Sequence, residues 1–239
     1  MMDVERYVVA IVALGAPVEA EAKALAADLG TTAYEERLKL VAGLPAIVRA
    51  TTDMAAAHVL GGKLRARGHR AIVCRVADVV CASKMIQMQH FQLDHEGLES
   101  GGKQMPWVDL STLVRARHHR QVGATEIVEQ KKFNAARAIL TGGLIMHKSE
   151  KRRVSSTTSE VEQVLYLFRA SGNTPWLLRE HATNYGALGA ALTPTATRNF
   201  SIVVDQLRER APHAVFDDSL LRRPTIDDVD LYAHLVATR

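Results

Sequence analysis

The sequence predicts an α+β fold built from two domains. Helix, strand, helix and strand signals follow one another over residues 31–76, and beyond residue 85 short alternating strands with glycine turns replace them. The length of 239 residues suffices for two small domains, each with its own core. We expect a small β-α-α-β-α-β sandwich at residues 1–82, a mainly antiparallel β domain closed by a C-terminal helix at 85–222, and a tail at 223–239.

The composition is that of an ordinary globular protein, with 47% hydrophobic and 23% charged residues. The longest apolar run, Tyr7–Ala16, reaches about half of the length that a membrane helix needs, and acidic residues precede it. We therefore expect a cytoplasmic protein without a membrane span. Cys74 and Cys81 have no metal-ligand spacing and are too few for a disulfide framework, so we expect buried, reduced thiols.

The first domain is predicted to start with a central strand. Tyr7–Leu14 is a short, continuous, β-branched run, which is typical of a strand buried on both faces. Pro17–Leu29 has helical spacing, and Thr31 or Thr32 begins a second helix in which Glu35 completes a capping box. The second helix carries an apolar face formed by Tyr34, Leu38 and Val41.

The remaining elements of the first domain are a strand, a helix and a closing strand. Ala46–Thr51 is expected to be extended, and Thr52 or Asp53 caps a helix that ends at Gly68. Its predicted buried residues are Ala57, Leu60 and Leu64. Arg70–Val80 is expected to be the closing strand.

Two adjacent glycines, Gly61 and Gly62, interrupt this third helix. Each costs about 1 kcal/mol relative to alanine, so the pair indicates close approach by another part of a chain. Two explanations are possible, namely contact with the sheet of the same domain and contact with a partner. We favour contact within the domain, because packing explains most glycines within helices.

The segment LVAGLPAIVRATTDMAAAHVLGGKLRARGHRAIVCRV carries most of this element order. Over residues 7–76 the chain resembles the C-terminal domain of the ribosomal stalk protein, which recruits translation factors through a lysine-rich first helix pair after a Gly-Ala turn. Here Gly15 and Ala16 precede Glu19 and Glu21, so carboxylates stand where that family has cations. The resemblance implies the fold, and we do not extend it to the factor-binding role.

The second domain is predicted to open with an antiparallel meander. Met85–Leu93 alternates as a strand, turns follow at residues 94–97 and 100–102, and another strand covers residues 105–114. Later, Val161–Ala170 and Pro175–Glu180 form a hairpin. Gly97-Leu98 and Pro106-Trp107, in this order of elements, resemble the pleckstrin-homology-like folds of bacterial proteins.

The C-terminal part contains two amphipathic segments. Residues 197–210 predict a helix whose buried side chains are Phe200, Val203, Val204 and Leu207. Tyr185 and Phe200 are expected to anchor the intervening loop on the core. In the tail, residues 229–236 form an apolar stripe that docks either on its own domain or on a partner.

Residues 115–159 allow more than one interpretation. Glu126–Leu140 has helical spacing, but strands around Gly142-Gly143 fit equally well. Glu150–Glu160 is expected to be an exposed, mobile loop.

Basic residues are concentrated in one segment. Leu113–Arg153 contains ten Lys and Arg residues and three acidic residues, which leaves the rest of the chain acidic in balance. This basic segment is either an ordinary solvated face or a surface that binds an anionic partner. Phe133 is the one aromatic residue among residues 115–159, so phosphate contacts rather than base stacking would carry nucleic-acid binding. The candidate anion-binding residues are Arg115, Arg117, Arg120, Lys131, Lys132, Arg152 and Arg153.

Catalytic and metal-binding signatures are missing from the sequence. It has no GxSxG motif, no phosphate loop and no dinucleotide spacing. His118, His119, His147 and His181 lack metal-ligand spacing, and adjacent histidines on a strand point to opposite faces. We therefore expect no catalytic, metal or cofactor-binding residues and no enzymatic activity.

These observations favour a non-catalytic cytoplasmic adaptor or assembly protein that binds protein partners through two modules, with self-association left open. One alternative is a nucleic-acid or ribosome-associated factor that uses residues 113–153. Another is a small-molecule or lipid-binding module in the second domain.

Overall fold

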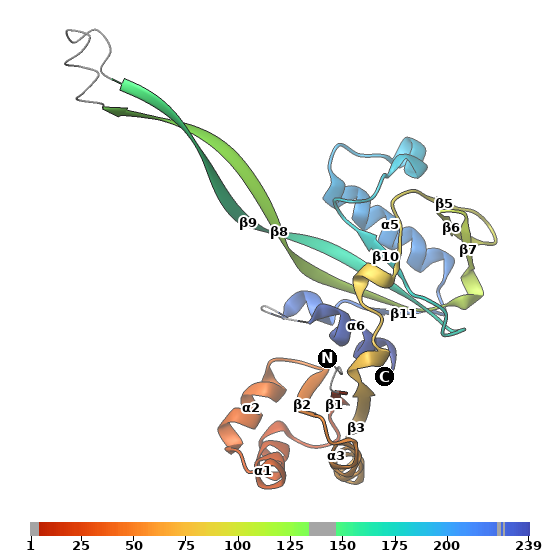
Figure 1. Cartoon of the computed structure of the whole chain (residues 1–239). Helices are drawn as coiled ribbons and strands as arrows, with labels where there is room; N and C mark the ends of the chain where they lie inside the picture. Colours follow the sequence, from red (N-terminus) through yellow and green to blue (C-terminus); the bar gives the residue numbers. More distant parts are fainter. Residues whose placement is uncertain (1–4, 134–146, 224–225, 227) are drawn as a thin grey trace. The chain divides into compact units, whose positions relative to one another are not determined.

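The computed structural model describes the chain except residues 1–4, 134–146, 224–225 and 227, and it describes side chains outside 119–133 and 147–160. The chain has an α+β fold, as predicted (Figure 1). Its contacts divide it into two compact units, one formed by Met1–His118 with Glu162–Arg239 and the other by His119–Val161. The domain boundary expected between residues 82 and 85 stays a prediction.

Within the larger unit, residues 5–82, here termed the first module, are built on a three-stranded antiparallel sheet in the order β2-β1-β3. The central strand β1 (Tyr7–Ala13) is buried along nearly all of its length, which confirms the prediction from its apolar run. β2 (Ala46–Thr51) and β3 (Arg70–Arg75) flank it. β3 is shorter than the predicted strand to Val80, because the chain turns into a 3-10 helix at Val76–Asp78.

Three helices belong to this module, namely α1 (Val18–Leu29), α2 (Ala33–Val41) and α3 (Met54–Ala66). The capping box of α2 is confirmed, because the Glu35 amide donates to the Thr32 hydroxyl at 3.2 Å and the Thr32 amide donates to the Glu35 carboxylate at 3.0 Å. Asp53 caps α3 by accepting from the Ala56 amide at 3.0 Å. The buried residues expected on α3 are confirmed.

The glycine pair in α3 has two different environments. A Cβ atom on Gly61 would lie 2.6 Å from Cγ2 of Val73, so close packing against the sheet of the same module explains this glycine. A Cβ atom on Gly62 would meet nothing within 4 Å.

We expect opposite effects from the two alanine substitutions. Gly62→Ala should raise the free energy of unfolding by about 0.5–1 kcal/mol, because alanine restricts the unfolded chain and fits this open site. Gly61→Ala should lower it by about 1–3 kcal/mol through overpacking on Val73. Urea unfolding of both variants checks this pair, and equal effects would contradict it.

The described part of residues 85–222, here termed the second module, contains two sheets. One has the strand order β11-β8-β9-β10-β4, and the other is the antiparallel meander β5-β6-β7, as predicted. The strands are β4 (Ile86–Gln87), β5 (Phe91–Leu93), β6 (Gly97–Ser100), β7 (Lys103–Pro106), β8 (Leu110–Phe133), β9 (His147–Arg169), β10 (Trp176–Arg179) and β11 (Val215–Asp217). Met85–Leu93 is therefore two short strands rather than one, and a 3-10 turn at Trp107–Asp109 separates β7 from β8.

Two expectations for the middle of the chain are wrong. The helical alternative fails over residues 126–133, which belong to β8, and the predicted loop at residues 150–160 is part of β9. Periodicity alone does not distinguish these cases, because the hydrogen bonds between β8 and β9 join residues that are distant in sequence. Residues 134–146 of the ambiguous segment, which include Gly142-Gly143, lie outside the described residues.

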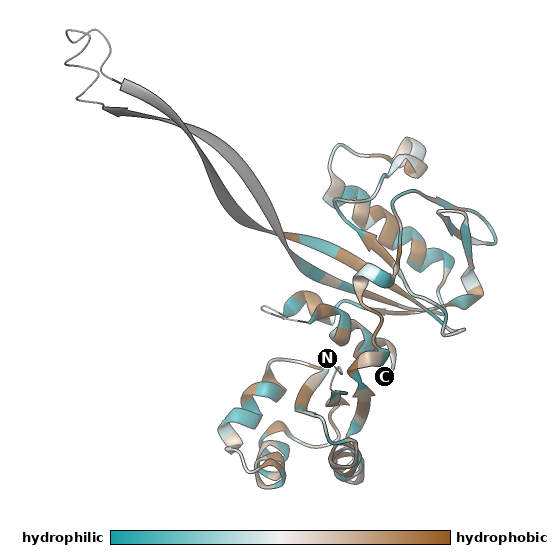
Figure 2. Ribbon diagram, viewed as in Figure 1, coloured by the Kyte–Doolittle hydropathy of each residue, from teal (hydrophilic) through white to brown (hydrophobic). Residues whose placement is uncertain are grey.

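The hairpin of β9 and β10 is confirmed, with Trp176 opposite Leu167. α5 (Ala196–Arg210) packs on one face of the five-stranded sheet, where Phe200 and Leu207 join a cluster with Leu165 and Leu167. Figure 2 shows hydrophobic and hydrophilic residues alternating along this helix. Tyr185 and Leu188 belong to the same cluster, so the loop before α5 is anchored as expected.

The C-terminal tail forms a helix, α6 (Val229–Ala237), that docks within the chain. Leu231 and Leu235 pack with Val8 and Ala10 of β1. Other residues of α6, Val229, Ala233 and Val236, pack with Val164, Tyr166 and Leu177 on the second face of the five-stranded sheet. A single short helix thus contributes to the cores of both modules.

The two cysteines are free thiols. Cys74 is buried, as predicted, whereas Cys81 is only partly buried, which corrects the expectation for this residue. No helix among the described residues has the length and apolar character required to cross a membrane.

Asp109 holds the turn of the β9-β10 hairpin. Its carboxylate accepts from the Ser171 amide at 2.8 Å, the Ser171 hydroxyl at 3.1 Å and Nε of Arg169 at 2.5 Å. Burial acts to raise the pKa of Asp109, but these donors outweigh it and the pKa lies below its ordinary value.

This lowered pKa predicts an acid-dependent contribution to stability. The folded chain binds the Asp109 proton less readily than the unfolded chain, so the contribution is complete above the unfolded pKa and is lost as the pH falls through the folded pKa. We expect Asp109→Asn to flatten the fall in melting temperature between about pH 5 and pH 2. Thermal unfolding across this range tests it, and an unchanged slope would refute it.

Candidate functional site

The predicted anion-binding residues are distributed over two neighbouring strands. Arg115 donates from Nε and Nη2 to Oε1 of Gln163, at 3.0 and 2.6 Å, and its guanidinium lies 5.4 Å from the ring centre of Phe200. The Arg115 side chain therefore makes its contacts within the second module. Arg117, two residues further along β8, is exposed.

The other predicted residues belong to the unit His119–Val161. Arg120, Lys131 and Lys132 lie on β8 and Arg152 and Arg153 lie on β9, but their side chains are outside the described part of the structure. This unit has eight Lys and Arg residues and four acidic residues, so it accounts for the whole net charge of +4. The larger unit is formally neutral.

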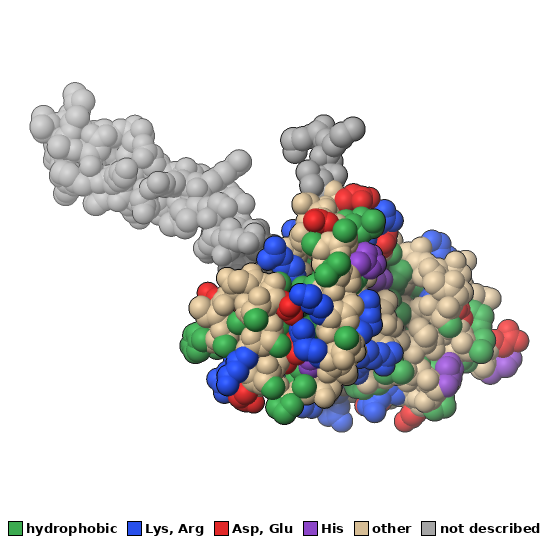
Figure 3. Space-filling model, turned by 90° about the horizontal axis from the view of Figure 1, so that it is seen from below, with side chains coloured by type: hydrophobic (Ala, Val, Ile, Leu, Met, Phe, Trp, Pro, Cys, Tyr) green, Lys and Arg blue, Asp and Glu red, His purple; other side chains and the backbone are tan. Residues whose placement is uncertain are grey.

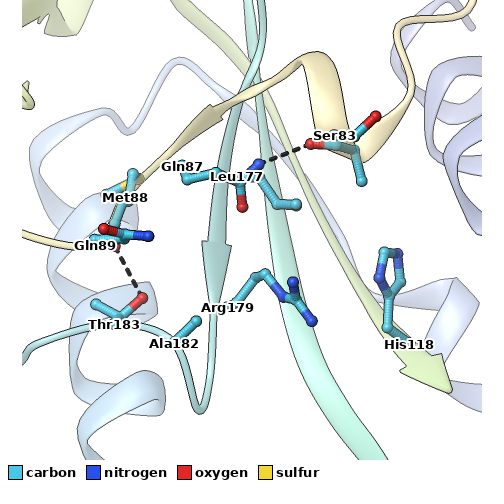
Figure 4. Close-up of a pocket in the computed structure, with 10 residues that line it drawn as sticks. Ser83, Gln87, Met88, Gln89, His118, Leu177, Arg179, Ala182 and Thr183 are labelled. Atoms are coloured by element: carbon cyan, nitrogen blue, oxygen red, sulfur yellow. Dashed lines mark hydrogen bonds between the residues drawn. The ribbon is translucent and has the colours of Figure 1, made fainter. Parts of the chain in front are cut away.

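A pocket of about 320 Å³, lined by both apolar and polar side chains, opens on the second module. Its lining residues come from the 3-10 turn Ala82–Lys84, β4, the start of β8, β10 and the following loop. Figure 4 shows Arg179 with the loop residues Ala182 and Thr183 on one side and His118 on the other. Gln87 and Gln89 line the pocket from the segment around β4.

A chain of hydrogen bonds lies next to this pocket. Nε2 of His118 is 2.5 Å from the Tyr166 hydroxyl, which donates to Oδ1 of Asp230 at 2.7 Å. The other Asp230 oxygen accepts from the Ala82 amide at 2.7 Å. Burial and the Asp230 charge raise the pKa of Tyr166 far above its ordinary value, so this phenol stays protonated and acts as a donor. Because that proton goes to Asp230, Nε2 of His118 donates to the phenol oxygen.

Arg179 does not provide the pocket with a free positive charge. Its guanidinium is paired with Glu162, which is almost completely buried. One oxygen of Glu162, Oε2, has no hydrogen-bond partner within the described structure. Arg179 therefore does not give this pocket an unpaired guanidinium for a strong anion.

The predicted histidines do not assemble into one site. His118 borders the pocket, His181 is exposed, and the side chains of His119 and His147 lie outside the described set. Within the described residues, no group of three or more His, Cys, Asp or Glu side chains is arranged to hold a metal ion.

Exposed apolar side chains gather on two helices of the first module. Of nine large hydrophobic residues exposed in the described structure, five lie on α2 and α3, and the others are single positions elsewhere. On α2 these are Tyr34, Leu38 and Val41, with exposed fractions of 68%, 47% and 53%. On α3 they are Met54 and Val59. Figure 3 views the molecule from below, where hydrophobic side chains are interspersed with charged ones.

The apolar face predicted on α2 therefore points to solvent. The helix instead buries Leu40 and Glu36, whose carboxylate accepts from Thr31 at 2.9 Å and from Lys39 at 2.8 Å. This pairing allows a charged residue to face the core, and it leaves the larger apolar side chains available for contacts outside the module.

The two glutamates of α1 also differ in position. Glu19 is exposed, whereas Glu21 is buried against Arg67 and His69. Of these two carboxylates, only that of Glu19 therefore lies at the surface.

A groove of about 250 Å³ lies between α1, β2 and α3. Leu29, Ala56, Val59 and Leu60 provide its apolar walls. Its polar residues are Asp28, Arg49, Thr51 and Lys63. Sequence reasoning missed this groove, because its residues come from three separate elements.

Charges at the rim of the groove are partly paired. Asp28 accepts from Lys63 at 2.6 Å and from Arg67 at 2.8 Å. Burial opposes ionisation of Asp28, but these two cations outweigh it and lower its pKa. Arg49 takes part in none of the ion pairs formed by the described residues.

Comparison with known proteins does not assign this site, because no protein-family model, curated protein or solved structure matches the chain.

Proposed function

We propose that the protein is a non-catalytic cytoplasmic adaptor or assembly protein that binds a partner protein through its first module. The observation that carries this proposal is the concentration of exposed large apolar side chains on α2 and α3. Isolated exposed hydrophobic residues are normal, but several on adjacent turns of one helix are characteristic of interaction sites. Tyr34 supplies an aromatic anchor of the kind that is enriched in protein interfaces.

The factor-binding role of the ribosomal stalk domain, which the chain resembles over residues 7–76, does not carry this proposal. That family recruits its partners through the first helix pair, which corresponds to α1 and α2 here. The exposed surface of α2 combines Tyr34, Leu38 and Val41 with charged side chains of both signs and is not lysine-rich, so we propose a different partner with an apolar complement.

Site-specific photo-crosslinking tests this function. A photoreactive amino acid at position 38 should give a discrete adduct with a partner protein in cells of the native host, whereas the same group at Leu192, which is similarly exposed in the second module, should not. Introducing Tyr34→Glu in the crosslinking chain should abolish the adduct, with circular dichroism as the check on folding. Equal labelling from positions 38 and 192, or no adduct at either, would refute the proposal. An adduct with a second copy of the chain would replace the adaptor by a self-assembling protein.

A second candidate is binding to nucleic acid through the unit His119–Val161, favoured by the location of the whole net charge in that unit. Phosphate contacts release counterions, so such binding must weaken steeply as salt rises. Filter binding of single-stranded and duplex RNA over a salt series tests it, and no retention at low ionic strength would exclude it.

A further inference from the structure

The groove between α1, β2 and α3 differs from the exposed face of α2 because it combines a cavity with an unpaired cation. Val59 is 61% exposed beside Leu60, which is only 6% exposed, so apolar surface continues from solvent into the core. A dry apolar cavity of about 150 Å³ holds a benzene ring. The groove, at about 250 Å³, has room for one branched or aromatic side chain.

The charges of the groove favour an acidic partner. Asp28 is engaged by Lys63 and Arg67, and Arg67 also pairs with Glu21, so the acidic groups near the groove are already neutralised. The guanidinium of Arg49 remains, on the exposed edge of β2. Arginine prefers planar carboxylates, which it binds through two parallel hydrogen bonds.

We infer that this groove binds a short peptide segment of the partner in which an apolar side chain is followed or preceded by Asp or Glu. The apolar side chain lies against Val59 and Leu60, and the carboxylate pairs with Arg49. A nucleic acid is a poorer fit, because the groove offers a single unpaired cation and no aromatic residue for base stacking. The inference rests on the proposed adaptor function and names the chemistry of its partner.

Peptide selection on the full-length chain tests the inference. A phage-displayed library of random heptapeptides should be enriched for sequences with Leu, Ile or Phe next to Asp or Glu. The same selection on Arg49→Glu should lose the acidic preference. A synthetic peptide chosen by the wild-type chain should bind Arg49→Glu at least tenfold more weakly in fluorescence anisotropy, and Arg49→Lys should retain part of the affinity.

Matched controls separate the groove from general charge effects. Arg70→Glu makes the same charge change at an exposed position of β3 that does not line the groove, and it should leave peptide affinity unchanged. Val59→Glu should abolish binding without unfolding the chain, because this side chain is already mostly exposed.

Three outcomes overturn the inference. They are selection without acidic-apolar enrichment, equal loss of affinity in Arg49→Glu and Arg70→Glu, and Arg49-dependent retention of RNA in place of peptide. In each case the crosslinking result at position 38 decides the adaptor function separately, so failure of the groove and failure of the proposed function are distinguishable.

Discussion

Replacing Glu21 with alanine is expected to lower the free energy of unfolding by about 3–5 kcal/mol, because it breaks a buried ionic network. The Glu21 carboxylate accepts from Nη2 and Nε of Arg67, at 2.6 and 2.9 Å, and lies 2.6 Å from Nε2 of His69. Nδ1 of His69 accepts from the Gly15 amide at 3.0 Å, so its Nε2 carries the proton that goes to Glu21. Without the carboxylate, a fully buried imidazole N–H loses its acceptor, and the mostly buried Arg67 guanidinium keeps only its contact with Asp28.

Glu19→Ala provides the matched control on the same helix. Glu19 is exposed and its nearest cation, Arg37, is 3.6 Å away, so its loss should cost no more than about 1 kcal/mol. Urea unfolding followed by circular dichroism measures both variants. Similar losses for Glu19→Ala and Glu21→Ala would show that the buried network does not stabilise the first module.

Leu235→Ala is expected to lower the free energy of unfolding by about 2–5 kcal/mol. Leu235 is fully buried and packs with Val8, Ala10 and Cys74 on the sheet face opposite α1 and α3. Truncation removes apolar contacts and leaves a cavity, and the neighbouring backbone of β1 cannot collapse into it without distorting the sheet. Chemical unfolding, monitored by intrinsic fluorescence and circular dichroism, provides the measurement.

The same substitution at Leu192 is the control, because Leu192 is 51% exposed and should contribute less than about 0.5 kcal/mol. If Leu235→Ala were as mild as Leu192→Ala, α6 would not be an integral part of the core. That result would instead favour the alternative in which the tail is available to a partner.

Local signals in the sequence predicted most of the first module correctly. The β-branched run of β1, the capping box at Thr32 and the C-terminal Gly68 of α3 each depend on residues within a few positions of one another. Backbone geometry and short-range hydrogen bonds are sufficient to specify them. The same applies to the β9-β10 hairpin and to the amphipathic α5.

Long-range pairing explains where prediction failed. Residues 126–133 and 150–160 have ambiguous or polar patterns, and they are extended because β8 and β9 are neighbours in one sheet. Their high content of basic residues was evident from the sequence, but their arrangement along two neighbouring strands was not.

Which face of a helix is buried was also decided by tertiary structure. Tyr34, Leu38 and Val41 form an apolar stripe in the sequence, and a stripe of this kind ordinarily packs on a core. In the folded module Glu36 and Leu40 take that place. Thr31 and Lys39 both donate to Oε1 of the buried Glu36 carboxylate, whereas Oε2 has no hydrogen-bond partner within the described structure.

The sequence by itself thus determined the fold class, the order of elements in the first module and the location of the net charge. Tertiary structure determined which residues come together at the candidate sites. Glu21 meets His69 across 48 positions, Ala82 meets Asp230 across 148, and the groove at Arg49 combines three elements. Helix caps and turns depend on neighbouring residues, whereas grooves and buried ion pairs depend on packing that brings distant residues together.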